Sequence, residues 1–206
     1  MNPAPTHSVS GSGKTPWLSP MTKWLGVATL VWILDRFTKF YVVTHLEFGE
    51  RIVVWPFFSW IHLNNTGAAF NFLRDAGGWQ RWFFVVLAIG FSAYLLYEMK
   101  KLSDQRLASA ARTPDFPLMQ KMQKMQKMQK MQKLMGWSYA LILAGALGNL
   151  YDRVTEGHVV DFILVHYQNH YFPAFNVADS AITVGATGWI LSMILHARSA
   201  QDEEST

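Results

Sequence analysis

The sequence contains no cysteine, and only 16% of its 206 residues are charged. The absence of cysteine excludes a disulfide-stapled fold, thiol catalysis and every metal site that needs a thiolate ligand. The charged fraction lies well below the roughly 25% of an average soluble domain. Half of the residues are apolar, which excludes an intrinsically disordered chain.

The apolar residues are gathered in four blocks that polar segments separate. A membrane helix needs about 20 mostly apolar residues to cross about 30 Å of hydrocarbon. We therefore expect an all-α membrane protein with four transmembrane helices. No small-x-small cleavage site follows the first block, which favours a span over a cleaved signal peptide. The third and fourth blocks are rich in small residues, so we expect these two helices to pack closely. The predicted spans cover residues 24–43, 82–97, 134–151 and 172–195.

Basic residues are unevenly distributed on the two sides of these spans. Twelve of the 18 Lys and Arg residues fall on the side of both termini, four fall on the other side, and two lie within the first span. The positive-inside rule therefore predicts that both termini and the loop of residues 98–133 are cytoplasmic. The pI of about 9.3 then reflects membrane topology rather than nucleic-acid binding.

Two terminal segments and one repeat lie outside the spans. Residues 1–20 are rich in Pro, Ser, Gly and Thr and predict a disordered cytoplasmic tail, and residues 199–206 predict a second one. The membrane domain between them, residues 21–198, contains five successive Met-Gln-Lys triplets at residues 119–133. A period of three drifts by about 60° per repeat around a helix, so Met forms a winding stripe. We interpret the run as a solvated helical extension of the third span; a polybasic segment resting on anionic lipid is the alternative.

The loop between the first two spans is predicted to contain a small β-sheet. Residues 51–55 and 57–63 are β-branched and aromatic, Pro56 separates them, and a turn signal follows at residues 64–67. The many aromatic side chains of this loop fit an interfacial belt at headgroup depth. They equally fit a surface that guides a membrane-bound substrate.

Ionisable residues at membrane depth are costly and are therefore functional candidates. Asp35 and Lys39 are four residues apart, so they share one face of the first span and can form a pair. Such a pair serves either to pin the helix to its neighbours or to position a substrate. Asp152 is followed directly by Arg153, which keeps the carboxylate ionised and suits structure or docking better than proton transfer.

Asp161 and Asp179 lie in apolar sequence without an adjacent cation. Two carboxylates that meet in a low-dielectric site share one proton, which provides both an acid and a base at neutral pH. One carboxylate then activates water, and the other protonates the carbonyl or the leaving amine, as in aspartic proteases. Asn149 and Asn176 add neutral donors that can orient this chemistry or bind a peptide backbone. The hypothesis requires the fold to bring the two carboxylates together.

Two alternatives compete with an aspartic dyad. A metal could be held by His158, Asp161, His166 and His170, but no Glu lies between His166 and His170, so the zinc-protease signature is absent. A proton-coupled transporter could also use intramembrane Asp and Asn residues. Four spans without an internal repeat are few for a transporter, and the acidic residues cluster near one face of the membrane.

Five short segments occur in a fixed order: residues 35–39 (Asp-Arg-Phe-Thr-Lys), 65–70 (Asn-Thr-Gly-Ala-Ala-Phe), 145–153 (Gly-Ala-Leu-Gly-Asn-Leu-Tyr-Asp-Arg), 159–162 (Val-Val-Asp-Phe) and 175–180 (Phe-Asn-Val-Ala-Asp-Ser). Together they resemble the bacterial lipoprotein signal peptidase family, signal peptidase II. One such motif would be weak evidence, but five in order are specific. The resemblance covers about residues 20–196. The N-terminal tail and the Met-Gln-Lys run depart from the family pattern.

The resemblance implies a four-helix inner-membrane aspartic endopeptidase with a small periplasmic β-cradle between the first two helices and an active site near the periplasmic face. Such an enzyme removes the signal peptide from prolipoproteins just before a cysteine that carries diacylglycerol. The resemblance makes Asp161 and Asp179 the catalytic pair and implies no metal or cofactor. Expected partners are diacylglyceryl-prolipoproteins, membrane lipids and globomycin-type inhibitors, with no nucleic acid, and we expect a monomer. The implied supporting or substrate-contacting positions are Asp35, Lys39, Asn65, Gly67, Asn149, Asp152, Arg153, Asn176 and Ala178.

Overall fold

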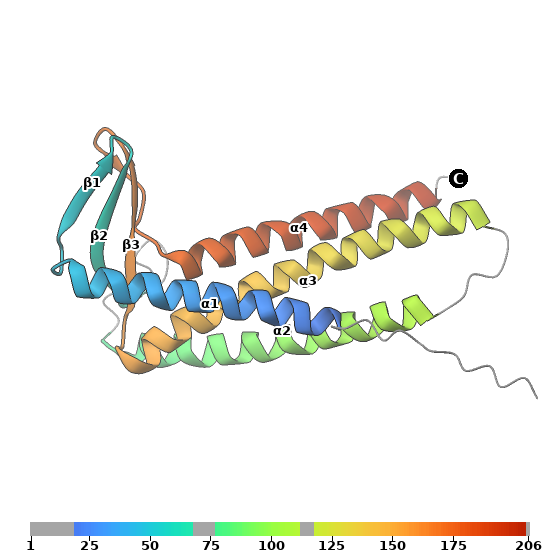
Figure 1. Ribbon diagram of the computed structural model, residues 1–206, viewed down its shortest axis with the longest axis horizontal. Helices are drawn as coiled ribbons and strands as arrows, with labels where there is room; N and C mark the ends of the chain where they lie inside the picture. The colour runs from blue at the N-terminus through green and yellow to red at the C-terminus, as the bar shows by residue number, and fades with distance from the viewer. Residues whose placement is uncertain (1–18, 68–76, 112–117, 205–206) are drawn as a thin grey trace, which may run out of the picture.

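Four long helices form a bundle, and a small sheet closes one end of it (Figure 1). The computed structural model describes residues 19–67, 77–111 and 118–204. Most of the predicted N-terminal tail and residues 68–70 of the second family motif lie outside the described residues. The elements in chain order are α1 (Pro20–His45), β1 (Arg51–Trp55), β2 (Phe58–Asn65), α2 (Trp79–Ala111), α3 (Leu118–Thr155), β3 (Val159–Tyr167), β4 (His170–Tyr171) and α4 (Val177–Glu204).

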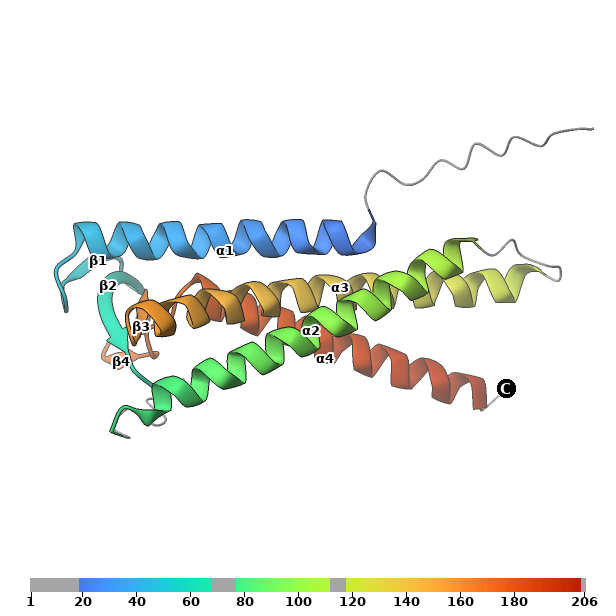
Figure 2. The ribbon, with the colours of Figure 1, turned by 90° about the horizontal axis from the view of Figure 1, so that it is seen from below.

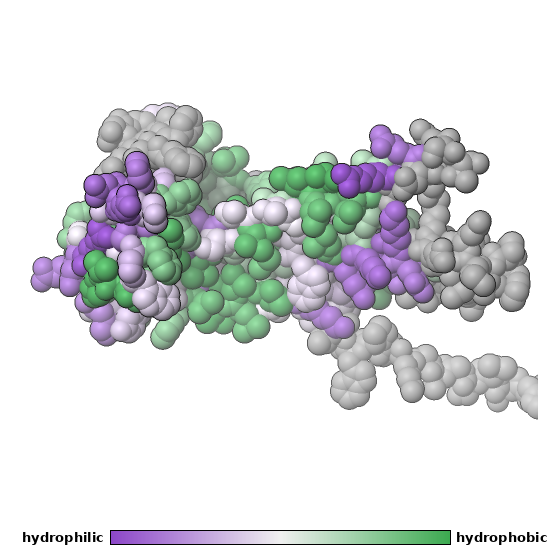
Figure 3. Space-filling view, turned by 90° about the horizontal axis from the view of Figure 1, so that it is seen from above, coloured by the Kyte–Doolittle hydropathy of each residue, from purple (hydrophilic) through white to green (hydrophobic). Residues whose placement is uncertain are grey.

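Three of these helices, α2, α3 and α4, are long and apolar enough to cross a membrane. The expectation of a helical multi-pass membrane protein is confirmed to that extent. The remaining helix, α1, has 26 residues, which span about 39 Å at 1.5 Å per residue. Its length suffices, but Asp35, Arg36 and Lys39 make it more polar than the other three. In Figure 3, apolar side chains cover the middle of the molecule, and hydrophilic ones gather at its two ends.

The sheet is larger than the sequence indicated. The predicted hairpin between the first two helices is present as β1 and β2, but two further strands, β3 and β4, come from the segment between α3 and α4. All neighbours pair antiparallel in the order β1-β2-β3-β4. The predicted start of the fourth span at residue 172 is wrong, because α4 begins at Val177. Phe172 and Phe175 instead form backbone hydrogen bonds with β3, which keep this segment extended until just before α4.

The ends of the helices extend beyond the predicted spans. The Met-Gln-Lys run lies within α3, which continues without interruption from Leu118 into the third span. The side chains of Lys127, Lys130 and Lys133 in this run are exposed. At the C-terminus, α4 continues to Glu204, into the segment predicted as a tail. No Gly or Pro follows residue 188 to interrupt it.

The central helix is α3, which packs against the other three helices and most extensively against α4 (Figure 2). The close pairing of the third and fourth predicted spans is therefore confirmed. Glycine makes this approach possible at two points on α3. A Cβ atom on Gly145 would lie 2.2 Å from the backbone oxygen of Ala178, and one on Gly148 would lie 2.6 Å from the Asp35 carboxylate.

Replacement of Gly145 by alanine is expected to separate α3 from α4 at the beginning of α4. The added Cβ atom would meet the Ala178 backbone, which cannot move aside as a flexible side chain can. We therefore expect a loss of about 1–3 kcal/mol in the free energy of unfolding. The control is Gly90→Ala in α2, where a Cβ atom meets nothing within 4 Å. Thermal unfolding in detergent should give a lower midpoint for Gly145→Ala and an unchanged or higher one for Gly90→Ala. Equal midpoints for the two variants would contradict the close contact.

Candidate active site

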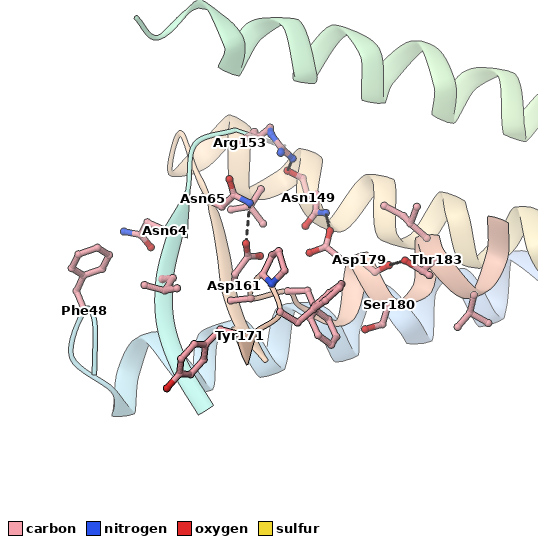
Figure 4. Close-up of a pocket in the computed structure, with 18 residues that line it drawn as sticks. Phe48, Asn64, Asn65, Asn149, Arg153, Asp161, Tyr171, Asp179, Ser180 and Thr183 are labelled. Carbon is pink, nitrogen blue, oxygen red and sulfur yellow. Dashed lines mark hydrogen bonds between the residues drawn. The ribbon is translucent and has the colours of Figure 1, made fainter. Parts of the chain in front are cut away.

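A cavity of about 860 Å³ lies where the sheet meets the N-terminus of α4. Both predicted catalytic carboxylates line it: Asp161 comes from β3, and Asp179 comes from the first turn of α4. Figure 4 shows Asn65 of β2 beside Asp161 and Asn149 of α3 beside Asp179. The fold therefore brings together side chains from four elements that are far apart in the sequence.

Asp179 is held by a capping box at the start of α4. The Asn176 side-chain oxygen accepts a hydrogen bond from the Asp179 backbone N–H at 2.9 Å, and the Asp179 carboxylate accepts one from the Asn176 backbone N–H at 3.3 Å. A third free N–H of the first turn, that of Ala178, donates to Asp35 Oδ1 at 2.9 Å. These bonds fix the backbone that carries Asp179 and satisfy donors that a helix N-terminus leaves unpaired.

Amide side chains hold both carboxylates. Asp161 is buried and accepts hydrogen bonds from Asn176 Nδ2 at 2.8 Å and from Asn65 Nδ2 at 2.9 Å, one on each oxygen. Asp179 Oδ1 accepts a bond from Asn149 Nδ2 at 2.7 Å. Asn176 thus contacts both carboxylates, through its side-chain amide on one and its backbone N–H on the other.

The electrostatic environment keeps a proton on this pair near neutral pH. Burial raises the pKa of Asp161 from its ordinary value of 3.8 to about 7, and the negative charge of Asp179 acts in the same direction. The hydrogen bonds from Asn65 and Asn176 and the positive charge of Lys39 oppose the rise. Asp161 can therefore give or take a proton at neutral pH, which is the property that acid–base catalysis requires.

Beneath the two carboxylates lies a buried network of charges. Lys39 Nζ lies 2.9 Å from Asp35 and 2.8 Å from Asp152, and it donates to Asn149 Oδ1 at 3.0 Å. Asp35, Lys39 and Asp152 are each at most 2% exposed. The predicted pairing of Asp35 with Lys39 is confirmed. Lys39 in turn orients Asn149, the residue that donates to Asp179.

The predicted partnership of Asp152 with its neighbour Arg153 is replaced by a different arrangement. Asp152 pairs with Lys39 and with Arg36. Arg153 donates instead to the backbone carbonyls of Asn149 at 3.3 Å and Gly67 at 2.9 Å. Consecutive residues of a helix point in different directions, so Asp152 faces α1 while Arg153 faces the cavity and the end of β2.

The four residues of the alternative metal site are not gathered together. Within the described parts of the chain, no group of three or more His, Asp or Glu side chains is arranged to hold a metal ion. His166 lies instead 2.9 Å from Arg51 and 3.2 Å from the Ser59 hydroxyl, and His170 is exposed on β4.

The sequence as a whole matches a known family. A family model described as Signal peptidase (SPase) II matches residues 27–113 and 118–195. The chain belongs to the signal peptidase II family. The resemblance that the five short motifs indicated is therefore confirmed over most of the chain.

Relatives of this signal peptidase II chain are similar along nearly their whole length. The Lipoprotein signal peptidase of Pseudomonas putida is 46% identical over 178 residues, which are 85% of this chain and 89% of the relative. That of Pseudomonas aeruginosa is 44% identical over 180 residues, which are 86% and 91% of the two chains. A solved structure titled as a bacterial membrane enzyme at 2.3 Å resolution has a TM-score of 0.61 and 28% identity, and the match covers 84% of this chain and 87% of that one.

One charged residue near the site of this signal peptidase II was not singled out from the sequence. Arg36 pairs with Asp152 and, at 3.2 Å, with Asp35. The sequence did contain a signal for Arg36: it lies at the end of the apolar part of the first span, where a charged side chain requires a partner. The neighbouring Asp35 and Lys39 carry the spacing that the sequence argument used, and Arg36 lies between them.

The pKa of Asp161 predicts how stability depends on pH. Its folded pKa of about 7 exceeds the ordinary 3.8, so the folded protein binds this proton more tightly than the unfolded chain does. This contribution is fully present below pH 3.8 and is lost as the pH rises to about 7. Asp161→Asn should remove this part of the pH dependence of the thermal midpoint, and Asp104→Asn, at an exposed position of α2, should retain it. The assignment would be contradicted if the thermal midpoint of the wild type rose between pH 3.8 and pH 7 and Asp161→Asn abolished that rise.

Proposed function

We propose that this chain is an aspartic endopeptidase that removes signal peptides from diacylglyceryl-modified prolipoproteins by cleaving just before the lipidated cysteine. The observation that carries the proposal is the pair of carboxylates, Asp161 and Asp179, in one cavity with amide donors on both. The substrate class rests on the relatives, which are named Lipoprotein signal peptidase.

The proposed reaction begins with one proton shared between Asp161 and Asp179. The ionised carboxylate takes a proton from water, whose oxygen attacks the scissile carbonyl carbon, while the protonated carboxyl gives its proton to the carbonyl oxygen. As the tetrahedral intermediate collapses, one of its hydroxyl groups returns a proton to the ionised carboxylate, the C–N bond breaks, and the amine leaves with the proton of the other carboxyl. The pair is then left with one proton, as at the start. The two groups titrate as a unit, so the dyad and not either residue carries the pH dependence.

The cavity suits a substrate that arrives from the bilayer. Beyond the dyad it is lined by apolar side chains of α4 and of the segment before it, including Phe172, Ile182 and Val184. Val184 is 60% exposed on α4, a candidate membrane span, so this side of the cavity faces lipid. In the proposed reaction the acyl chains of the substrate stay among lipids while the peptide crosses the dyad.

The proposed topology follows from the charge distribution. In it α1 crosses the inner membrane together with α2, α3 and α4. Both termini and the Met-Gln-Lys run lie in the cytoplasm, and the sheet with the dyad lies at the periplasmic face. The apolar band between two hydrophilic ends in Figure 3 supports it, as does the position of the sheet at one end of the bundle. In this proposal the chain acts as a monomer.

The decisive experiment is cleavage of a diacylglyceryl-modified prolipoprotein by the purified protein. Asp161→Asn and Asp179→Asn keep the side-chain volume and remove the titrating proton. We expect each to lose activity by about a hundred- to ten-thousand-fold while the thermal midpoint shows a folded protein. Asp104→Asn is the matched control and should cleave like the wild type. Globomycin, the inhibitor that the family resemblance implies, should block the wild-type reaction.

The outcomes separate the parts of the proposal. Near-normal activity of either dyad variant would overturn the dyad and make Asp152 the next candidate. A wild-type protein that cleaves no lipidated substrate would refute the peptidase itself. Proton-coupled flux in liposomes, without any cleavage, would then favour the transporter alternative.

A further inference from the structure

Arg36 belongs to the first family motif, residues 35–39, but neither the sequence argument nor the resemblance assigns it a role in the site. Its guanidinium nevertheless contacts two of the assigned residues: one terminal nitrogen pairs with Asp152, and the other lies 3.2 Å from Asp35 Oδ2. Its side chain is 19% exposed, whereas those of the two carboxylates are at most 3% exposed. We propose that Arg36 is a positioning residue that neutralises the buried charge network beneath the dyad and thereby controls the protonation of Asp161 and Asp179. The inference rests on the proposed peptidase function.

Charge balance is the first argument. The network contains two carboxylates, Asp35 and Asp152, and two cations, Lys39 and Arg36, all joined by direct ion pairs. Lys39 alone would leave one negative charge uncompensated in a buried site, which costs far more there than at a surface. Arg36 provides the fourth charge, and its planar fork allows it to contact both carboxylates at once, which a lysine ammonium does less well.

The position of Arg36 is fixed by an aromatic ring. Its guanidinium carbon lies 4.8 Å from the centre of the Tyr151 ring, and Tyr151 also packs edge-on against Trp32. Arg36 Nε is buried and has no hydrogen-bond partner within the described structure. A side chain that leaves a buried donor unpaired keeps its place through its other contacts, here two ion pairs and a cation–π contact.

Two short routes connect Arg36 to the dyad. Through Asp35, it reaches the Ala178 backbone N–H in the first turn of α4, one residue from Asp179. Through Asp152, it reaches Lys39, which bonds to Asn149 and hence to Asp179. Beyond the ion pair of Arg36 with Asp152, every contact in the two routes joins atoms that lie 2.7 to 3.2 Å apart.

The charges that face the dyad determine the sign of the effect. They are Asp35 and Lys39 of α1 and Arg153 of α3, with Asp152 behind them against Lys39 and Arg36, while β2 contributes the neutral Asn65. Removal of the Arg36 charge makes this surrounding more negative, which favours the protonated forms of the dyad. Both limbs of a bell-shaped activity profile should therefore move to higher pH.

The test compares Arg36→Gln with Arg36→Lys in the full-length protein, by the pH dependence of kcat for cleavage of a diacylglyceryl-modified prolipoprotein. We expect Arg36→Gln to lower kcat and to shift both limbs upward by about half to one pH unit. Arg36→Lys keeps the charge and should restore the wild-type profile. Lys23→Gln, which removes one exposed charge from the other end of α1, should leave the profile unchanged.

Stability measurements keep the inference testable if Arg36→Gln folds poorly. The double variant Arg36→Gln/Asp152→Asn again has equal numbers of positive and negative charges in the network, so its thermal midpoint should exceed that of Arg36→Gln. An unshifted profile for a folded Arg36→Gln would overturn the inference, and so would a double variant no more stable than the single one. A wild-type enzyme without cleavage activity would instead refute the proposed function, since the stability comparison needs no substrate.

Discussion

The site depends on the hydrogen bonds of one side chain, that of Asn176. Its oxygen caps α4 through the Asp179 N–H, and its nitrogen donates to Asp161 on β3. The same nitrogen lies within 3.4 Å of Asn149 on α3. One fully buried amide therefore fixes the relative positions of a helix, a strand and a second helix. An aspartate here could accept the bond from the Asp179 N–H, but it would add a third carboxylate to the site and, when ionised, could not donate to Asp161.

A second constraint follows from placing so many charges where water is scarce. Each carboxylate near the dyad needs a specific partner, because an unpaired buried charge is strongly destabilising. The chain meets this need with side chains from α1 and with the free N–H groups at the start of α4. These contacts require the backbone of α4 to lie against Gly145 of α3 and the Asp35 side chain of α1 to lie against Gly148, which explains why both positions are glycine. The ion pairs and hydrogen bonds of the site can therefore form only if the helices pack this closely.

Much of the molecule could be predicted from the sequence, because its signals were local. Apolar blocks indicated the helices, β-branched and aromatic residues indicated the β1–β2 hairpin, and the spacing of Asp35 and Lys39 indicated their pair. The apolar surroundings of Asp161 and Asp179 singled out these two carboxylates, and the structure places both in one cavity. In each case the information lay within one continuous segment of the chain.

The features that escaped prediction depend on contacts between distant segments. The strand β3 owes its conformation to pairing with β2, and its short apolar sequence alone is equally compatible with the end of a helix. The choice of Lys39 and Arg36 over Arg153 as partners of Asp152 depends on how α3 is rotated against α1. Arg36 was overlooked because its role appears only when Asp152, 116 positions later, is placed beside it.

The bond between Asp35 and the Ala178 N–H joins residues that are 143 positions apart in the chain. Synthesis proceeds from the N-terminus, so Asp35, Arg36 and Lys39 are made long before the helix end that Asp35 binds. The cavity that contains Asp161 and Asp179 is complete only after α4 has docked. A nascent chain that stops before residue 176 therefore contains neither Asp179 nor the Asn176 amide that holds Asp161, so this arrangement of the two carboxylates forms only once the start of α4 has been made.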